Sequence, residues 1–348
     1  MKKVEGSFAM VLCALGWSLG GVFLKYVTIN SFAIAGFRSL IAFITIAVFS
    51  KSLPHFFVRN NQNNGIDKKQ TLYLWLSAIS YAGTMILYVI SNKLTYAANV
   101  VFLEYTEPVW VILFSTMLLG EKNKKIDYIT FAGIVVGLLL FFADNLLESR
   151  TGAQASEFAD TALLGNILAL CSGITFAATT IFQRKQQLLI ARLSQAEVQK
   201  QFATSEKESV AKKEISPHLE TSASHKKHDT SRDAFMLAQI IVATFGLPFV
   251  FIKENGIPDI KSITFLLLLG ILQMGIPNIL YSIGIKKVTA LSASLITMIE
   301  PLMNPIWVFI FVRELPTWKC ILGGVIILTC ILAREIVLKR QHINKDAN

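Results

Sequence analysis

The sequence predicts an all-α membrane protein with ten transmembrane helices, arranged as two inverted five-helix repeats. Three observations support this fold class: long apolar stretches, an uneven distribution of basic residues, and a pattern that recurs at one fixed offset. Of the 348 residues, 53% are hydrophobic and only 16% are charged, and the mean hydropathy is +0.54. Soluble domains carry about 25% charged residues, so this composition argues against a water-soluble enzyme.

Ten apolar stretches approach the roughly 20 residues that a helix needs to cross a bilayer. The first follows Lys2 and Lys3 and resembles a signal peptide, but it runs too long for a cleaved one. The stretches are continuous rather than alternating, so we expect helices and not barrel strands. They lie at residues 8–29, 31–50, 72–92, 96–119, 126–143, 162–183, 235–252, 262–284, 290–312 and 318–338.

Basic residues indicate the orientation of these helices. Of the 33 lysine and arginine residues, 25 fall on the side of the N-terminus, six fall on the other side, and Lys25 and Arg38 lie within spans. Because cytoplasmic loops carry an excess of such residues, we expect both termini in the cytoplasm and the chain in the cytoplasmic (inner) membrane. The net charge of +10 is thereby explained without a nucleic-acid partner.

The same orientation assigns the connections. Residues 144–161 form an external loop, 184–234 a cytoplasmic insertion, and 339–348 a cytoplasmic tail. The insertion is polar and mixed in charge. Its first third, through Phe202, has the composition of a helix that extends the preceding span, and the part beyond Pro217 is predicted to be disordered.

A repeat relates the two halves of the chain, residues 1–143 and 162–338. Glu107-Pro108 and Glu300-Pro301 are each followed, thirteen residues after the proline, by another glutamate. Each half holds five spans, and because five is odd the halves enter the membrane from opposite sides. Such inverted repeats are typical of secondary transporters. The offset of 193 residues also aligns Tyr88 with Tyr281, Lys93 with Lys286 and Ala97 with Ala290.

Several short motifs carry a resemblance to a known family. They are Gly16-Trp17-Ser18 with Lys25, then Arg38, the stretch Pro108 to Gly120-Glu121 before a span with Gly133 and Gly137, and in the second half Pro301 to Arg313-Glu314 and Gly323-Gly324. With these motifs the chain resembles the drug/metabolite transporter superfamily, EamA type, outside 184–234. The resemblance implies ten helices around a cavity lined by helices 1, 3, 4, 6, 8 and 9. It also implies transport of amino acids, nucleoside-like metabolites or other small organic solutes, often outward.

Two departures from the family pattern matter. Arg313 stands where a glycine is expected before Glu314, and the insertion at 184–234 is longer than the usual connection. Both departures make it harder to infer the substrate of this chain from that of any one subfamily.

Glu107 and Glu300 are the first candidates for the transport pathway. Each lies near the middle of its span, where a charge costs at least about 2.5 kcal/mol on insertion scales. Such residues usually face a cavity, and a buried carboxyl group can take up and release a proton near neutral pH. The alternative is that each glutamate caps backbone groups freed by the adjacent proline, or pairs with a fixed cation.

Arg38 and Glu104 are predicted at the same depth, about 10–12 Å from the outer surface. We expect a pair between them, because a buried arginine needs a carboxylate. Either this is a permanent salt bridge between helices, or the arginine is released to bind a substrate carboxylate. Further cavity walls with polar tips are expected from Trp17, Tyr81, Tyr88, Gln273, Asn278 and Tyr281, although packing or lipid contact would also explain the aromatic residues. The helix that carries Gln273 and Asn278 is predicted to be bent.

The function that best fits is a secondary transporter, proton- or ion-coupled and acting by alternating access. A metabolite exchanger without proton coupling, a polytopic membrane enzyme and a scaffold stay as alternatives. No Walker motif is present, so we do not expect ATP hydrolysis. We expect no catalytic residues, no cofactor and no metal, since all five histidines lie outside the spans and no cysteine pair has metal-site spacing. The expected partners are a small-molecule substrate and the lipid bilayer, not nucleic acid, and a homodimer is left open.

Single cysteines at positions 150 and 220 of a cysteine-free variant test the orientation. We expect position 150 to react with a membrane-impermeant thiol reagent from outside and position 220 only from inside. The reverse labelling would overturn the orientation, together with every depth inferred from it.

Overall fold

A computed structural model describes residues 2–59, 66–95, 97–121, 123–141, 161–211, 229–252, 258–312 and 318–346. Within these ranges the regular secondary structure is helical, apart from one isolated antiparallel bridge between Arg59 and Ile66. Eight of the described helical segments are long and apolar enough to cross a membrane. The predicted all-α membrane class is thereby confirmed.

The helices of the first half follow the predicted spans closely. Asn30 begins one helix by accepting a hydrogen bond from the backbone N–H of Phe32, and Asp67 caps the next through the N–H groups of Lys69 and Gln70. Gly120 ends the fourth span in the left-handed region, with φ +70°. The elements are α1 (Lys2–Ser18), α2 (Gly20–Lys25), α3 (Ser31–Ser50), α4 (Lys68–Leu94), α5 (Ala97–Glu104), α6 (Glu107–Leu119) and α7 (Lys125–Phe141).

The second half departs from the predicted boundaries at three places. The helix of the sixth span continues beyond residue 183, as its composition predicted through Phe202, and it extends farther, to Ala211. The next helix begins at Thr230 rather than 235, because the Asp229 carboxylate accepts the N–H of Arg232 and starts it earlier. The last helix continues past the predicted end at 338 to Asp346. The elements are α9 (Ala162–Ala211), α10 (Thr230–Gly246), α11 (Phe249–Ile252), α12 (Ile260–Leu268), η2 (Leu269–Gly275), α13 (Ile276–Gly284), α14 (Ala290–Thr297), α15 (Ile299–Val312) and α16 (Trp318–Asp346).

Two predicted segments lie largely outside the described residues. These are the external loop at 144–161, of which only Thr161 is described, and the segment beyond Pro217 up to 228. The predicted irregularity in the helix of Gln273 is present, because η2 is a π-helical turn between α12 and α13. A π-helical turn widens the helix locally and is frequent at functional sites.

Two helices are interrupted at equivalent positions. α5 and α14 begin and end at residues 193 apart, α6 and α15 end 193 apart, and α7 and α16 begin 193 apart. The first interruption ends directly before Glu107-Pro108, and the second ends one residue before Glu300-Pro301. The proline ring clashes with the carbonyl group four residues earlier, and these carbonyl groups belong to Glu104 and Thr297, the last residues of α5 and α14.

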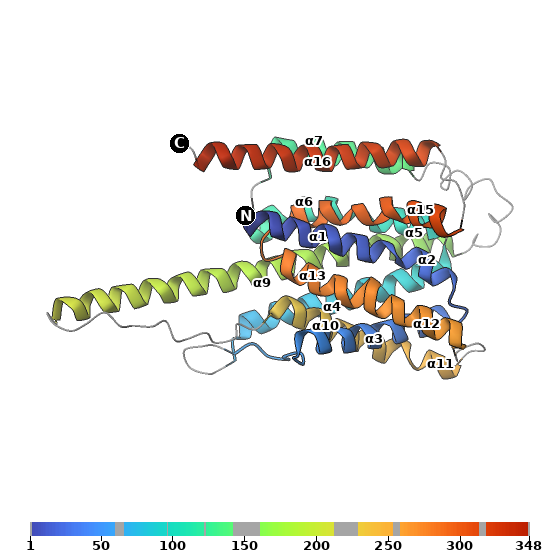
Figure 1. The fold of residues 1–348 in the computed structure, drawn as a ribbon, viewed down its shortest axis with the longest axis horizontal. Coiled ribbons are helices and arrows are strands. Elements are labelled where there is room, and N and C mark those ends of the chain that lie inside the picture. The colour runs from blue at the N-terminus through green and yellow to red at the C-terminus, as the bar shows by residue number, and fades with distance from the viewer. Residues whose placement is uncertain are drawn as a thin grey trace.

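The helices form a bundle with one outlying layer (Figure 1). α7 and α16 pack against each other in that layer, while α4 packs on α9, α3 on α10, and α1 on α13. A buried ion pair joins α7 to α16, with 2.7 Å between Arg334 Nε and Asp127 Oδ1. α1 begins, α16 ends and α9 projects at the same end of the molecule, which we call the terminal end.

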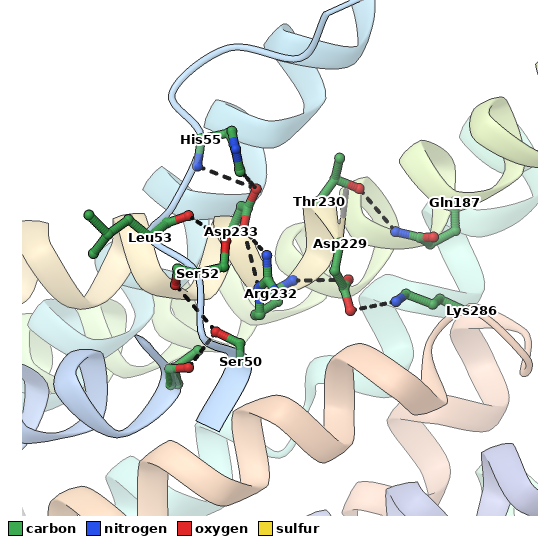
Figure 2. Close-up of polar contacts among 11 residues, drawn as sticks. Ser50, Ser52, Leu53, His55, Gln187, Asp229, Thr230, Arg232, Asp233 and Lys286 are labelled. Carbon is green, nitrogen blue, oxygen red and sulfur yellow. Dashed lines mark hydrogen bonds and ion pairs between the residues drawn. The ribbon is translucent and has the colours of Figure 1, made fainter. Parts of the chain in front are cut away.

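A polar network lies near the terminal end of the bundle (Figure 2). Asp233 is 1% exposed and accepts from His55 Nδ1 at 3.0 Å and from Arg232 Nη2 at 3.0 Å. Asp229 pairs with Lys286 at 2.5 Å. The network therefore joins the chain after α3, the start of α10 and the chain after α13.

Glycine permits the close crossing of α3 and α10. A Cβ atom added to Gly36 would lie 2.5 Å from Leu247 N and 2.7 Å from Gly246 C. A Cβ atom added to Gly246 would lie 2.5 Å from Phe32 O. Small residues are the usual means of bringing two backbones together in a membrane.

Gly36→Ala should lower the melting temperature of the purified protein, because overpacking costs roughly 1–3 kcal/mol and the contacts are backbone atoms that cannot move aside. Gly83→Ala is the matched control, since its added Cβ would meet only Thr175 Cγ2, at 3.8 Å. Equal melting temperatures for the two variants would show that the α3–α10 crossing tolerates a side chain.

Candidate functional site

A central cavity of about 150 Å³ lies where the interrupted helices face each other. Its lining comes from α1, α2, α3, α4, α5, α9, η2 and α15. These include the six helices that the family resemblance implied, with α3 added through Arg38. Seven of the ten predicted pathway residues line it: Trp17, Arg38, Tyr81, Tyr88, Glu104, Gln273 and Glu300.

Arg38 and Glu104 share this cavity but do not form the expected ion pair. The Arg38 side chain donates through Nη2 to Met85 Sδ at 3.6 Å. The Glu104 carboxylate accepts from Ser172 Oγ on α9 at 3.1 Å. Equal depth was therefore not enough to bring the two side chains into contact, because Arg38 bonds to a thioether and Glu104 to a hydroxyl group instead. The attraction between the guanidinium and the carboxylate acts across the cavity.

Glu300 reaches the cavity from the second interruption. Tyr105, which lies in the break between α5 and α6, lines the same cavity. Sequence reasoning missed Tyr105, although it lies between the two glutamates of the segment Glu104–Glu107. The two breaks thus face the same cavity, one with a tyrosine and the other with a carboxylate.

Three buried polar atoms of the lining make no hydrogen bond with any residue that the structure describes. They are Trp17 Nε1, Arg38 Nε and Gln273 Oε1. A buried polar atom without a partner costs about 1–3 kcal/mol, so such atoms need explanation. Two of these atoms are donors and one is an acceptor, and all three belong to cavity-lining side chains.

Aromatic rings form a wall of the cavity. Trp17 stacks on Tyr281 with 5.6 Å between ring centroids and contacts Phe176 edge-on at 5.9 Å. The Tyr81 hydroxyl donates to Asn278 Oδ1 at 3.3 Å. Tyr281 and Asn278 do not line the cavity themselves, so these two predicted pathway residues support the wall from behind.

Glu107 is also outside the lining, contrary to the expectation that it faces the cavity. It is 3% exposed and accepts from Thr180 Oγ1 at 3.2 Å and from the hydroxyl of Ser294. These partners are side-chain hydroxyl groups on α9 and α14, not backbone groups freed by Pro108. Sequence reasoning missed Thr180 and Ser294, because nothing in the sequence marks them among the other serine and threonine residues of their helices.

A second polar cluster joins α9 to the chain after α6 and to the chain between α13 and α14. Arg184 Nε donates to Glu121 Oε1 at 2.9 Å and its Nη1 to the carbonyl oxygen of Ile285 at 3.2 Å. The other carboxylate oxygen of Glu121 accepts the N–H of Ala290 at 3.2 Å. Among the described residues, no group of three or more His, Cys, Asp or Glu side chains is placed to hold a metal ion.

The model of the EamA-like transporter family matches residues 4–143 and 225–333. The chain belongs to the EamA-like transporter family. The predicted resemblance is confirmed, and the two matched segments confirm that this multi-pass membrane protein contains an EamA repeat. No curated protein matches the chain significantly. A solved structure described only as a crystal structure of a protein has a TM-score of 0.68 at 14% identity, over 97% of this chain and 98% of its own, which shows a shared fold.

A double-mutant cycle tests whether Arg38 and Glu104 are paired. We expect the effects of Arg38→Ala and Glu104→Ala on unfolding free energy to add within about 0.5 kcal/mol, because the side chains do not touch and have different partners. Asp127→Ala with Arg334→Ala is the control cycle, in which breaking a direct buried pair costs roughly 3–5 kcal/mol. A coupling of that size between Arg38 and Glu104 would show that they pair in solution.

Proposed function

We propose that this EamA-like protein is a secondary transporter that moves a small zwitterionic metabolite, an amino acid or a related solute, by alternating access. The observation that carries the proposal is the central cavity, which holds one guanidinium and two carboxylates without an ion pair between them. Its volume suits a small solute, because drug-sized ligands occupy sites of roughly 300–1,000 Å³.

The lining favours a ligand with both charges. A ligand carboxylate would accept from Arg38 Nε and from Trp17 Nε1, two buried donors of the lining that make no hydrogen bond with a described residue. A ligand ammonium group would face Glu104, Glu300 and the free acceptor Gln273 Oε1. A neutral solute would leave these buried charges uncompensated, which is unfavourable in low dielectric.

The architecture proposed for the transport cycle has ten spans in two inverted repeats, residues 1–143 and 162–338. The equal offset of the two interrupted helices supports it. α7 has 17 residues, and α14–α15 has an apolar segment of only Ala290–Met303, which explains why eight segments satisfy the length required for a span. The charge distribution supports cytoplasmic termini, an external loop at 144–161, a cytoplasmic insertion at 184–234 and a cytoplasmic tail at 339–348.

The proposed driving force is a proton or ion gradient, and the expected direction is export across the inner membrane. Glu107 and Glu300 are the proposed coupling carboxylates, because both are in the membrane core and neither forms an ion pair with a described residue. Alternating access would open the terminal side by breaking the contacts of Arg184 and Glu121.

Transport into proteoliposomes under an imposed pH gradient tests the proposal. The probes are a set of free amino acids, their carboxyl amides and their des-amino acids. We expect movement of the free amino acids and at least a tenfold loss for both analogue types, because each lacks one of the two charges. Arg38→Gln should abolish the preference for the acid over the amide, while the exposed Arg192→Gln should not.

Two results would contradict separate parts of this proposal. Equal transport of an amino acid and its amide would reject the zwitterionic substrate but keep the transporter. No gradient-driven movement of any probe, with correctly folded and inserted protein, would reject transport of these solutes.

A further inference from the structure

A row of buried contacts connects the cavity to Glu107. Trp17 lines the cavity and stacks on Tyr281. The Tyr281 hydroxyl lies 2.9 Å from Thr180 Oγ1, which lies 3.2 Å from Glu107 Oε1. All four side chains are at most 5% exposed. Since Glu107 does not line the cavity, a change at its carboxylate has to reach a bound ligand through intermediate groups.

The direction of these hydrogen bonds depends on the charge of Glu107. An ionised carboxylate only accepts, and a hydroxyl group has one proton to donate. Thr180 therefore donates to ionised Glu107 and must accept from Tyr281. When Glu107 takes up a proton on Oε1, it becomes a donor to Thr180, which then donates to Tyr281. A single proton at Glu107 thus reverses both bonds and reaches the ring on which Trp17 stacks.

We propose that Thr180 is a positioning residue that transmits the protonation of Glu107 to the aromatic wall of the ligand cavity. This inference rests on the proposed function. Thr180 binds no ligand and takes up no proton, and its role is to set the orientation of the Tyr281 hydroxyl. The hydroxyl of Ser294, on the other carboxylate oxygen, fixes Glu107 to α14, so that the response is directed toward α9 and α13.

Few other groups can change the charge environment of Glu107. Glu104 lies one turn earlier on α5, and Tyr281 faces it from α13, with Cys13 of α1 next to that tyrosine. Neither α14 nor the part of α9 up to residue 183 carries a charged residue. On α9, the polar contact to Glu107 is Thr180, which makes this threonine the residue to test.

The experiment compares Thr180→Val with Thr180→Ser in purified protein reconstituted into lipid nanodiscs. Valine keeps the shape and removes the hydroxyl group, whereas serine keeps the hydroxyl group. The measurement is the dissociation constant for the best-transported free amino acid from pH 5 to pH 8. We expect the wild type to vary with pH, Thr180→Val to lose at least two-thirds of that variation, and Thr180→Ser to restore it.

Thr179→Val is the matched control. Thr179 is fully buried beside Thr180, but its hydroxyl group bonds only to the carbonyl oxygen of Thr175 in its own helix, at 2.9 Å. We expect this variant to keep the wild-type pH profile. If Thr180→Val does not fold, Tyr281→Phe removes the same hydrogen bond from the other side, keeps the ring, and should flatten the profile in the same way.

Several outcomes would overturn the inference. A folded Thr180→Val or Tyr281→Phe protein with the wild-type pH profile would show that the row does not transmit protonation. A wild-type affinity that does not vary with pH would show that protonation of Glu107 does not affect ligand binding. In both cases gradient-driven transport in proteoliposomes would still stand, so failure of this inference is distinguishable from failure of the proposed function.

Discussion

The central cavity depends on two prolines that each follow a glutamate. Pro108 and Pro301 fit the first turn of a new helix, but they cannot continue the helix before it, because the ring clashes with the carbonyl group four residues earlier. Each span is therefore divided into two shorter helices. The residues at the divisions, Glu104, Tyr105 and Glu300, then point into shared space instead of packing as continuous helix surface.

The interrupted helices recur at one offset in the two halves, but the halves differ in charge. The offset that aligns Glu107 with Glu300 places Thr297 at the position of Glu104. The first half therefore supplies the guanidinium of Arg38 and the carboxylate of Glu104 to the cavity, and the second half supplies the carboxylate of Glu300. Similar backbones with unequal charges give the cavity a polarity, which suits a ligand that itself has a positive and a negative end.

The sequence predicted the all-α membrane class, most helix positions and seven residues of the cavity lining, because insertion into a bilayer leaves strong signals in hydropathy and charge. It did not predict side-chain partners. Arg38 and Glu104 lie at similar depth, yet Arg38 bonds to Met85 and Glu104 to Ser172. Depth in the membrane does not fix the direction in which a side chain points around its helix axis. Thr179 and Thr180 look alike in sequence, but one bonds to its own helix and the other reaches Glu107.

Helix α9 forms hydrogen bonds with every acidic side chain of the α5–α6 segment and with Glu121, which follows that segment. Ser172, Thr180 and Arg184 of α9 contact Glu104, Glu107 and Glu121 respectively. The same helix continues as a rod to Ala211, and its 50 residues give a length of about 75 Å at 1.5 Å per residue. Its projecting end is continuous with the part of α9 that contacts the three glutamates. A displacement of that end would act on all three acidic contacts at once, so whatever holds it in the cell also fixes the alignment of α9 with the cavity.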